Sequence, residues 1–143
     1  MKGMILTADA ASMDSNGKVS MLGGFWTSVG EGPTRMDVVV SIRLLPSELG
    51  RHGLAITLDR LDGEPSGPVF AVQGELAIEA PASEVPQAEI AANQILNLPP
   101  VSLAAGVYKL SLKVDDVLLD EWAFVVAPRL NGSDTGEANS AEG

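Results

Sequence analysis

Alternation of apolar and polar residues is the pattern that most constrains the fold of this 143-residue chain. In residues 36–45, Val40 and Ile42 would share one face of a strand. Ser41 falls on the opposite, polar face, together with Val39. The same period of two recurs at residues 53–61, 68–79 and 107–114. This period is typical of β-strands that bury one face and leave the other in water, so the sequence predicts a β protein.

The dipeptide Asn16-Gly17 predicts a β-hairpin near the N-terminus. Asn and Gly tolerate the positive φ angles that both central residues of a type I′ turn adopt, which makes this pair a strong hairpin signal. We therefore expect a strand near residues 3–11 and another near residues 18–28, joined by a two-residue turn.

Further breaks separate the later strands. Asp115-Asp116 lies between residues 107–114 and the apolar residues 117–127, and it predicts a tight hairpin although neither residue is glycine. Residues 62–67 form a loop by composition, because Asp, Gly, Pro and Ser dominate them. Pro99-Pro100 lacks two consecutive backbone donors, so it should mark the end or the edge of a strand.

Residues 86–98 leave two alternatives open. Ile90 and Leu96 alternate with Asn93, which fits a strand, but residues 88–94 would also suit a turn or two of helix. No sustained helical period appears elsewhere. Seven to eight short strands spaced by turns predict an all-β, antiparallel β-sandwich of immunoglobulin-like type or a barrel. We favour the sandwich, because the length suits two packed sheets.

The composition divides the chain into two parts. Residues 1–128 have the length of one domain and are predicted to fold around a single core. Residues 129–143 carry no large apolar side chain after Leu130, and such a segment cannot bury enough surface to offset the entropy of ordering. We therefore predict a disordered acidic C-terminal tail.

The charge is unevenly distributed and excludes one class of partner. With 19 acidic and 9 basic residues, the formal net charge is −10. Residues 1–47 carry four charges of each sign and sum to zero, residues 48–128 sum to −8, and residues 129–143 sum to −2. Nucleic-acid binding without sequence preference needs clustered Lys and Arg, so we expect no nucleic-acid partner.

Absent residue types exclude further chemistry. The chain has no cysteine and one histidine, so disulfides, thiolate catalysis and a zinc site of Cys and His ligands are ruled out. The apolar run after Lys2 ends at Asp9, short of the roughly 7–15 residues of an export signal. No segment reaches the roughly 18–20 apolar residues of a membrane span. We expect a cytoplasmic protein without a membrane partner.

Four motifs together carry a family resemblance. They are MLGGFW at residues 21–26, LPPV at 98–101, GVYKL at 106–110 and VDD at 114–116. Over residues 3–127 the chain resembles a family of small uncharacterised proteins of bacteria and bacteriophages, classed as a domain of unknown function. That resemblance implies a β-sandwich and no assigned catalytic residues. One departure is Asp116, which fills the position where such hairpins usually carry glycine and must adopt a left-handed conformation.

Two groups of polar residues are weighed as sites. His52 is the only histidine, but Arg51-His52-Gly53 has the character of a solvated loop entering a strand, so we do not expect it to be catalytic. Asp115, Asp116, Asp120 and Glu121 gather carboxylates around one turn, and calcium binds through such oxygens. Their spacing does not match the EF-hand pattern and is interrupted by residues 117–119, so a solvated hairpin is favoured over a metal site.

Phe25 and Trp26 are candidates for a partner-binding surface. As neighbours on a strand they should face opposite sides, so one aromatic ring is exposed unless both faces are covered. Gly23-Gly24 precedes them and predicts a bulge or a close backbone contact beneath an aromatic ring rather than a phosphate loop. An exposed aromatic residue on the near-neutral first third would make a good anchor for a protein partner.

The leading hypothesis is a non-enzymatic interaction or structural module that needs no cofactor. It would work with a protein partner, as a homo-oligomer, or inside a larger particle such as a phage virion. One alternative is a small-ligand or calcium-binding domain using Asp115, Asp116 and Asp120. The other is a hydrolase that uses two carboxylates about 5–10 Å apart.

Overall fold

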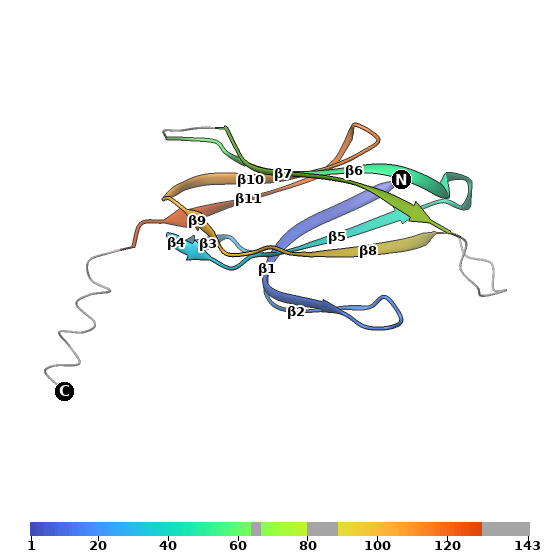
Figure 1. Ribbon diagram of the computed structural model, residues 1–143, viewed down its shortest axis with the longest axis horizontal. Helices are drawn as coiled ribbons and strands as arrows, with labels where there is room; N and C mark the ends of the chain where they lie inside the picture. Colours follow the sequence, from blue (N-terminus) through green and yellow to red (C-terminus); the bar gives the residue numbers. More distant parts are fainter. Residues whose placement is uncertain (64–66, 80–88, 130–143) are drawn as a thin grey trace, which may run out of the picture.

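Two β-sheets packed face to face form the body of the protein in a computed structural model, which describes residues 1–63, 67–79 and 89–129 (Figure 1). Strand order in the first sheet is β2 (Val19–Gly24), β1 (Lys2–Met13), β5 (Asp37–Leu44), β8 (Ile90–Asn97). Strand order in the second is β3 (Ser28–Gly30), β11 (Val117–Ala127), β10 (Gly106–Val114), β6 (Gly50–Arg60), β7 (Gly67–Ile78). A separate pair joins β4 (Gly32–Thr34) to β9 (Val101–Leu103), and a single 3₁₀ turn, η1, covers Pro46–Glu48.

The predicted all-β sandwich is therefore confirmed, but its strands are more numerous. The described ranges contain eleven strands instead of seven or eight. Three of them, β3, β4 and β9, have only three residues, which is too short for a period of two to be seen. All pairings are antiparallel except that of β3 with β11.

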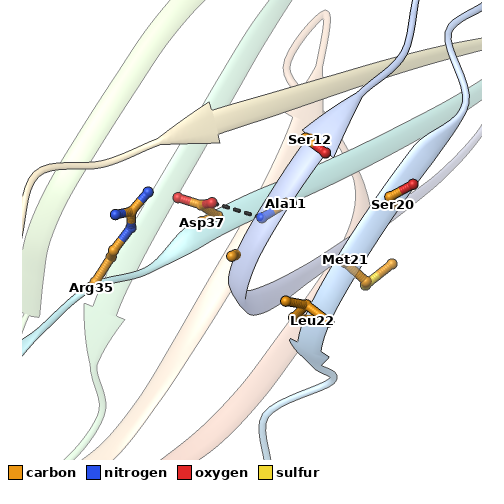
Figure 2. Close-up of a pocket in the computed structure, with 8 residues that line it drawn as sticks. Ala11, Ser12, Ser20, Met21, Leu22, Arg35 and Asp37 are labelled. Atoms are coloured by element: carbon orange, nitrogen blue, oxygen red, sulfur yellow. Dashed lines mark hydrogen bonds between the residues drawn. The ribbon is translucent and has the colours of Figure 1, made fainter.

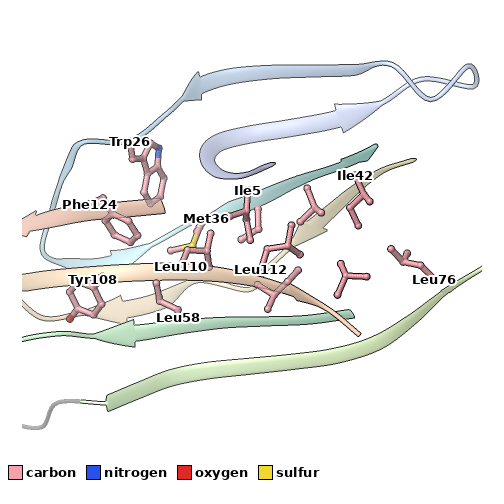
Figure 3. Close-up of a cluster of buried hydrophobic side chains, with 14 of the residues drawn as sticks. Ile5, Trp26, Met36, Ile42, Leu58, Leu76, Tyr108, Leu110, Leu112 and Phe124 are labelled. Carbon is pink, nitrogen blue, oxygen red and sulfur yellow. The ribbon is translucent and has the colours of Figure 1, made fainter. Parts of the chain in front are cut away.

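The core lies between the two sheets and consists of the alternating residues that the period predicts (Figure 3). Ile5 and Ile42 come from the first sheet, and Leu58 and Leu110 come from the second; all four are fully buried. Phe124 stacks on Tyr108 at one end of this layer, with ring centroids 5.8 Å apart. Burying apolar side chains of this size is the main source of stability for such a sandwich.

β1 changes partner halfway along its length. Its first part, Lys2–Ala8, pairs with β5, and its second part, from Ala8 to Met13, pairs with β2. The strand bends between the two parts, so the hairpin of its second part and β2 lies outside the sandwich on the side of β8 (Figure 1). We call residues 9–24 the arm.

The predicted turns have mixed outcomes. The type I′ turn at Asn16-Gly17 is wrong: only Gly17 has a positive φ, of 79°, and the loop closes between Asp14 and Lys18. The Asp14 side chain accepts backbone hydrogen bonds within this loop, which favours the wider turn. The tight turn at Asp115-Asp116 is confirmed, since both residues adopt left-handed φ angles of 50° and 66°.

The strand predicted over residues 18–28 is interrupted. β2 ends at Gly24 and β3 begins at Ser28, because Gly23 and Phe25 both have positive φ and turn the chain. Residues 90–97 form a strand and not a helix, while residues 86–88 lie outside the described part. Pro99 and Pro100 separate β8 from β9, as expected.

Two other predictions fall largely on residues that the structure does not describe. Residues 64–66 of the predicted loop and residues 130–143 of the predicted tail lie outside the described ranges. Within those ranges, no helix has the length and the apolar character needed to cross a membrane.

Candidate partner surface and histidine network

The arm covers the outer face of the first sheet. Leu6 and Val39 are partners in the β1–β5 register and belong to the alternate face from the core residues Ile5 and Val40. Val39 is nevertheless only 3% exposed, and Leu6 is fully buried. Val39 is therefore packed although alternation places it on the polar face, because the folded-back arm shields this part of the sheet from water.

Polar side chains on the same face tether the arm. Asp37 Oδ2 accepts a hydrogen bond of 2.8 Å from the backbone N–H of Ala11. Asn97, the register partner of Asp37 on β8, donates to the carbonyl of Ala11 at 3.5 Å. Further along β8, Asn93 donates to the carbonyl of Gly17 at 2.9 Å. Two side chains thus bind both backbone groups of Ala11, much as a neighbouring strand would.

A cavity of about 280 Å³ lies between the arm and the beginning of β5 (Figure 2). Asp37 is 1% exposed at this cavity, and its Oδ1 has no hydrogen-bond partner among the described residues. A buried polar atom without a partner costs about 1–3 kcal/mol. Asp37 therefore anchors the arm through Oδ2, although burial of its unpartnered Oδ1 costs free energy. The cavity is lined by Ala10, Ala11, Ser12, Ser20, Met21, Leu22, Arg35 and Asp37.

The chain leaves the arm through a tight backbone crossing. Gly23 has φ 57°, and a Cβ atom there would overlap the carboxylate of Asp9. That carboxylate accepts a hydrogen bond of 2.9 Å from the indole N–H of Trp26. The glycine at position 23 therefore leaves room for the Asp9 side chain, and not for an aromatic ring as predicted, which explains why this position carries no side chain.

The two aromatic candidates end up in different environments. Trp26 is 6% exposed and belongs to the core, where its ring meets Phe124 edge-on. Phe25 is 52% exposed, with its ring edge against Trp122 at 5.7 Å between centroids. Phe25 adopts φ 58°, a strained conformation for an aromatic residue, and its N–H donates to the Thr7 carbonyl at 2.9 Å. Only Phe25 remains available for a partner.

Other apolar side chains of the arm also face solvent. Leu22 is 73% exposed, the highest value among the exposed large apolar residues of the described chain, and Met13 is nearly half exposed. Apart from Asp9, which bonds to Trp26, residues 9–30 contain only two charges, Asp14 and Lys18, and both belong to the loop at the tip. The arm and its exit therefore present an apolar, nearly neutral surface, in contrast to the acidic remainder of the sandwich.

His52 lies in β6 and not in a solvated loop. Its side chain is 14% exposed, and its Nδ1 lies 2.6 Å from Asp115 Oδ2. Its Nε2 lies 2.5 Å from the backbone carbonyl of Glu48. The expectation of a solvated histidine is wrong because residues 50–53 pair with β7 and bring His52 beneath the Asp115-Asp116 turn.

The surroundings of His52 favour its protonated form. A carbonyl and an ionised carboxylate both act only as acceptors, so both contacts are hydrogen bonds when both ring nitrogens carry protons. The hydrogen bond to Asp115, followed by that to the Glu48 carbonyl, raises the pKa of His52 above its ordinary 6.5. The same contact lowers the pKa of Asp115. With both nitrogens occupied, His52 in this state has no free nitrogen to act as a base.

The carboxylates that cluster in sequence have separate partners in space. Asp115 also accepts a bond from the Gly53 N–H at 2.8 Å, and Asp120 accepts one from the Ile5 N–H at 2.8 Å. Glu121 forms an ion pair with Lys109 at 2.7 Å. No group of three or more His, Asp or Glu residues in the described ranges is arranged to hold a metal ion. The structure thus does not bring Asp115, Asp116 and Asp120 together as a calcium site.

Two contacts of these candidate sites were not visible from the sequence. His52 and Asp115 are separated by 63 residues, and only the register of β6 with β10 makes them neighbours. The anchoring role of Asp37 had one signal, since an aspartate directly precedes the apolar run Val38–Val40. Nothing in the sequence indicates that the arm folds back over that aspartate.

Comparison with known proteins gives a family and no function. No curated protein matches the chain. One family model, described as a family of unknown function (DUF6941), matches residues 3–127. These residues include the arm, both sheets and the His52–Asp115 contact, and they end with β11. The chain therefore belongs to this family of unknown function, DUF6941.

Proposed function

We propose that this protein is a non-enzymatic interaction module whose arm, together with Phe25, contacts an apolar surface of a protein partner. The observation that carries the proposal is the exposure of Leu22 and Phe25, at 73% and 52%, on a segment with almost no charge. Protein interfaces have apolar, aromatic-rich centres with few charged residues. The arm has this composition, whereas residues 48–128 are acidic.

The rigidity of Phe25 supports an anchoring role. Its ring rests against Trp122, whose indole N–H donates to the Trp26 carbonyl at 2.8 Å. The Phe25 N–H is bonded to the Thr7 carbonyl. A side chain already held in place loses less conformational entropy when a partner binds, which favours affinity. The partner could be a second copy of the chain or a component of a larger particle such as a virion.

Substitution of the two exposed residues tests the proposal. The full-length protein and the double variant Leu22→Ser/Phe25→Ser are each expressed as affinity bait in the organism whose genome encodes the chain. Native mass spectrometry then gives the mass of each captured complex. We expect the wild type to form a complex that the variant does not form, while the melting temperature of the variant stays close to that of wild type.

A matched control uses exposed residues of the acidic part. Leu61 and Val117 are about half exposed, so Leu61→Ser/Val117→Ser removes similar apolar surface elsewhere. A captured protein supports the proposal only if it is retained by this control and lost from the arm variant. A strictly monomeric wild type without a partner, or equal capture by both variants, would overturn the proposal.

A further inference from the structure

β7 forms an edge of the second sheet. It ends the strand order β3-β11-β10-β6-β7, and it pairs with β6 from Gly67 to Ile78. In the described ranges, no strand pairs with its other edge. β1 contacts β11 and β10, towards the other end of this strand order. Among the described residues, the outward N–H and C=O groups of β7 therefore have no partner strand, and such groups can pair with another strand.

Most of this edge lacks the features that protect natural sheet edges. Pro68 and a bulge, where Val69 is skipped in the register, occur at its beginning. From Phe70 to Ile78 the strand is regular and contains no proline and no basic residue. Its one charge, Glu75, already forms an ion pair with Arg51 at 3.0 Å. Edges without proline, lysine or bulges are templates for strand addition.

The regular segment is self-complementary when it is paired antiparallel about Gly74. Phe70 then faces Ile78 of the second copy, and Val72 faces Leu76 of that copy, on the side of the core. On the outer side, Gln73 faces Glu75, so the two carboxylates do not oppose each other. A Cβ atom at Gly74 would have no neighbour within 4 Å, so nothing blocks the two backbones from meeting at this point.

We propose that β7 of one chain pairs with β7 of a second copy, antiparallel and centred on Gly74, to join two sandwiches through one continuous sheet. Self-pairing is favoured over a basic partner strand because the segment carries no unpaired charge for such a partner to neutralise. Isologous two-fold contacts of this kind are the commonest route to homodimers. The pairing also covers Phe70 and Val72, which a bare edge leaves partly exposed.

Cysteine cross-linking tests the pairing directly, because the natural chain has no cysteine. Gly74→Cys places one thiol at the two-fold axis, where two copies would lie within the roughly 4.4–6.8 Å Cα separation of a disulfide. We expect a disulfide-linked dimer under mild oxidation at high micromolar concentration. Gly30→Cys is the matched control on the opposite edge of the same sheet, equally open, and it should form no disulfide-linked dimer.

A pair of lysine variants gives an independent measurement by analytical ultracentrifugation. Val72→Lys places a charge on the core side of the edge and should abolish the dimer. Ala71→Lys adds the same charge on the outer side, one residue earlier, and should retain the dimer. Melting temperatures show whether each variant is folded.

The proposal is overturned if wild type is monomeric at millimolar concentration, or if Gly74→Cys cross-links no faster than Gly30→Cys. A basic extended peptide that binds this edge in preference to self-pairing would also overturn it. Leu22→Ser/Phe25→Ser should leave the β7 dimer intact, so failure of the arm proposal and failure of this one give different results.

Discussion

The hairpin of β10 and β11 and the arm hairpin of β1 and β2 both carry apolar side chains, but they differ in how far those side chains are buried. Tyr108, Leu110 and Phe124 of the first are buried in the core, and the Asp115-Asp116 turn is held by His52. The arm exposes Met13 and Leu22, and side-chain hydrogen bonds from Asp37, Asn93 and Asn97 tether it to the sandwich. Apolar burial in the core stabilises the first hairpin, whereas polar contacts position the second over the buried Leu6 and Val39.

This difference predicts that the core hairpin determines the stability of the domain, whereas the arm determines partner binding. Substitutions in the core hairpin should destabilise the whole domain, because its residues pack in the core between both sheets. Substitutions in the arm should affect its position or its partner and leave the sandwich folded. Local opening of a weakly buried element is expected to need less free energy than global unfolding.

The largest effect is expected from Leu110→Ala in the core hairpin. Leu110 is fully buried, and removing such a side chain leaves a cavity that destabilises a protein by about 2–5 kcal/mol. Denaturant unfolding should report this loss in the free energy of unfolding. A change no larger than that of an exposed substitution such as Leu22→Ala would show that Leu110 is not part of a tightly packed core.

A smaller effect is expected from Asp37→Ala in the arm's anchor. The substitution leaves the buried N–H of Ala11 without its acceptor, at a cost of about 1–3 kcal/mol. Hydrogen exchange should show faster exchange in the arm with little change in β10 and β11. Arg35→Ala, at the same cavity, is the control; equal protection of the arm in both variants would argue against Asp37 as an anchor.

The stabilisation of the core hairpin by the His52–Asp115 contact should depend on pH. The pKa of His52 is raised in the folded protein, so its protonated form contributes stability that is fully present below the ordinary value of 6.5. This contribution is lost as pH rises through the raised pKa. The free energy of unfolding should therefore fall over that range in wild type. His52→Gln should lack this decline. An identical pH profile in both proteins would contradict a stabilising role for the His52–Asp115 contact.

The smallest effect on stability is expected from Leu22→Ser in the arm. Its side chain is mostly in water, so the free energy of unfolding should change by no more than about 0.5 kcal/mol. The same variant should capture less of the partner than wild type, whereas the Leu61→Ser control should capture as much as wild type. A large loss of stability would mean that Leu22 supports the fold and not the interface.

The sequence was sufficient to predict the long strands of the sandwich but not the folded-back position of the arm. Period-two alternation correctly placed strands around Val40, Leu58 and Leu110, because burial between two sheets dictates that pattern. Alternation alone does not account for the burial of Val39, and the loop predicted at His52 is wrong, since each residue is covered by a segment that is distant in sequence. The turn prediction also failed at Asn16, where the Asp14 side chain stabilises a wider turn than the dipeptide alone predicts.

Native-state hydrogen exchange tests the central claim most directly, because it measures the opening free energy of both hairpins in one experiment. The account predicts that amides of residues 9–24 exchange through a local opening of lower free energy than amides of β10 and β11. It further predicts that a bound partner slows exchange in the arm. Equal opening free energies for the two hairpins, both matching global unfolding, would contradict the claim that the arm is a separate contact element.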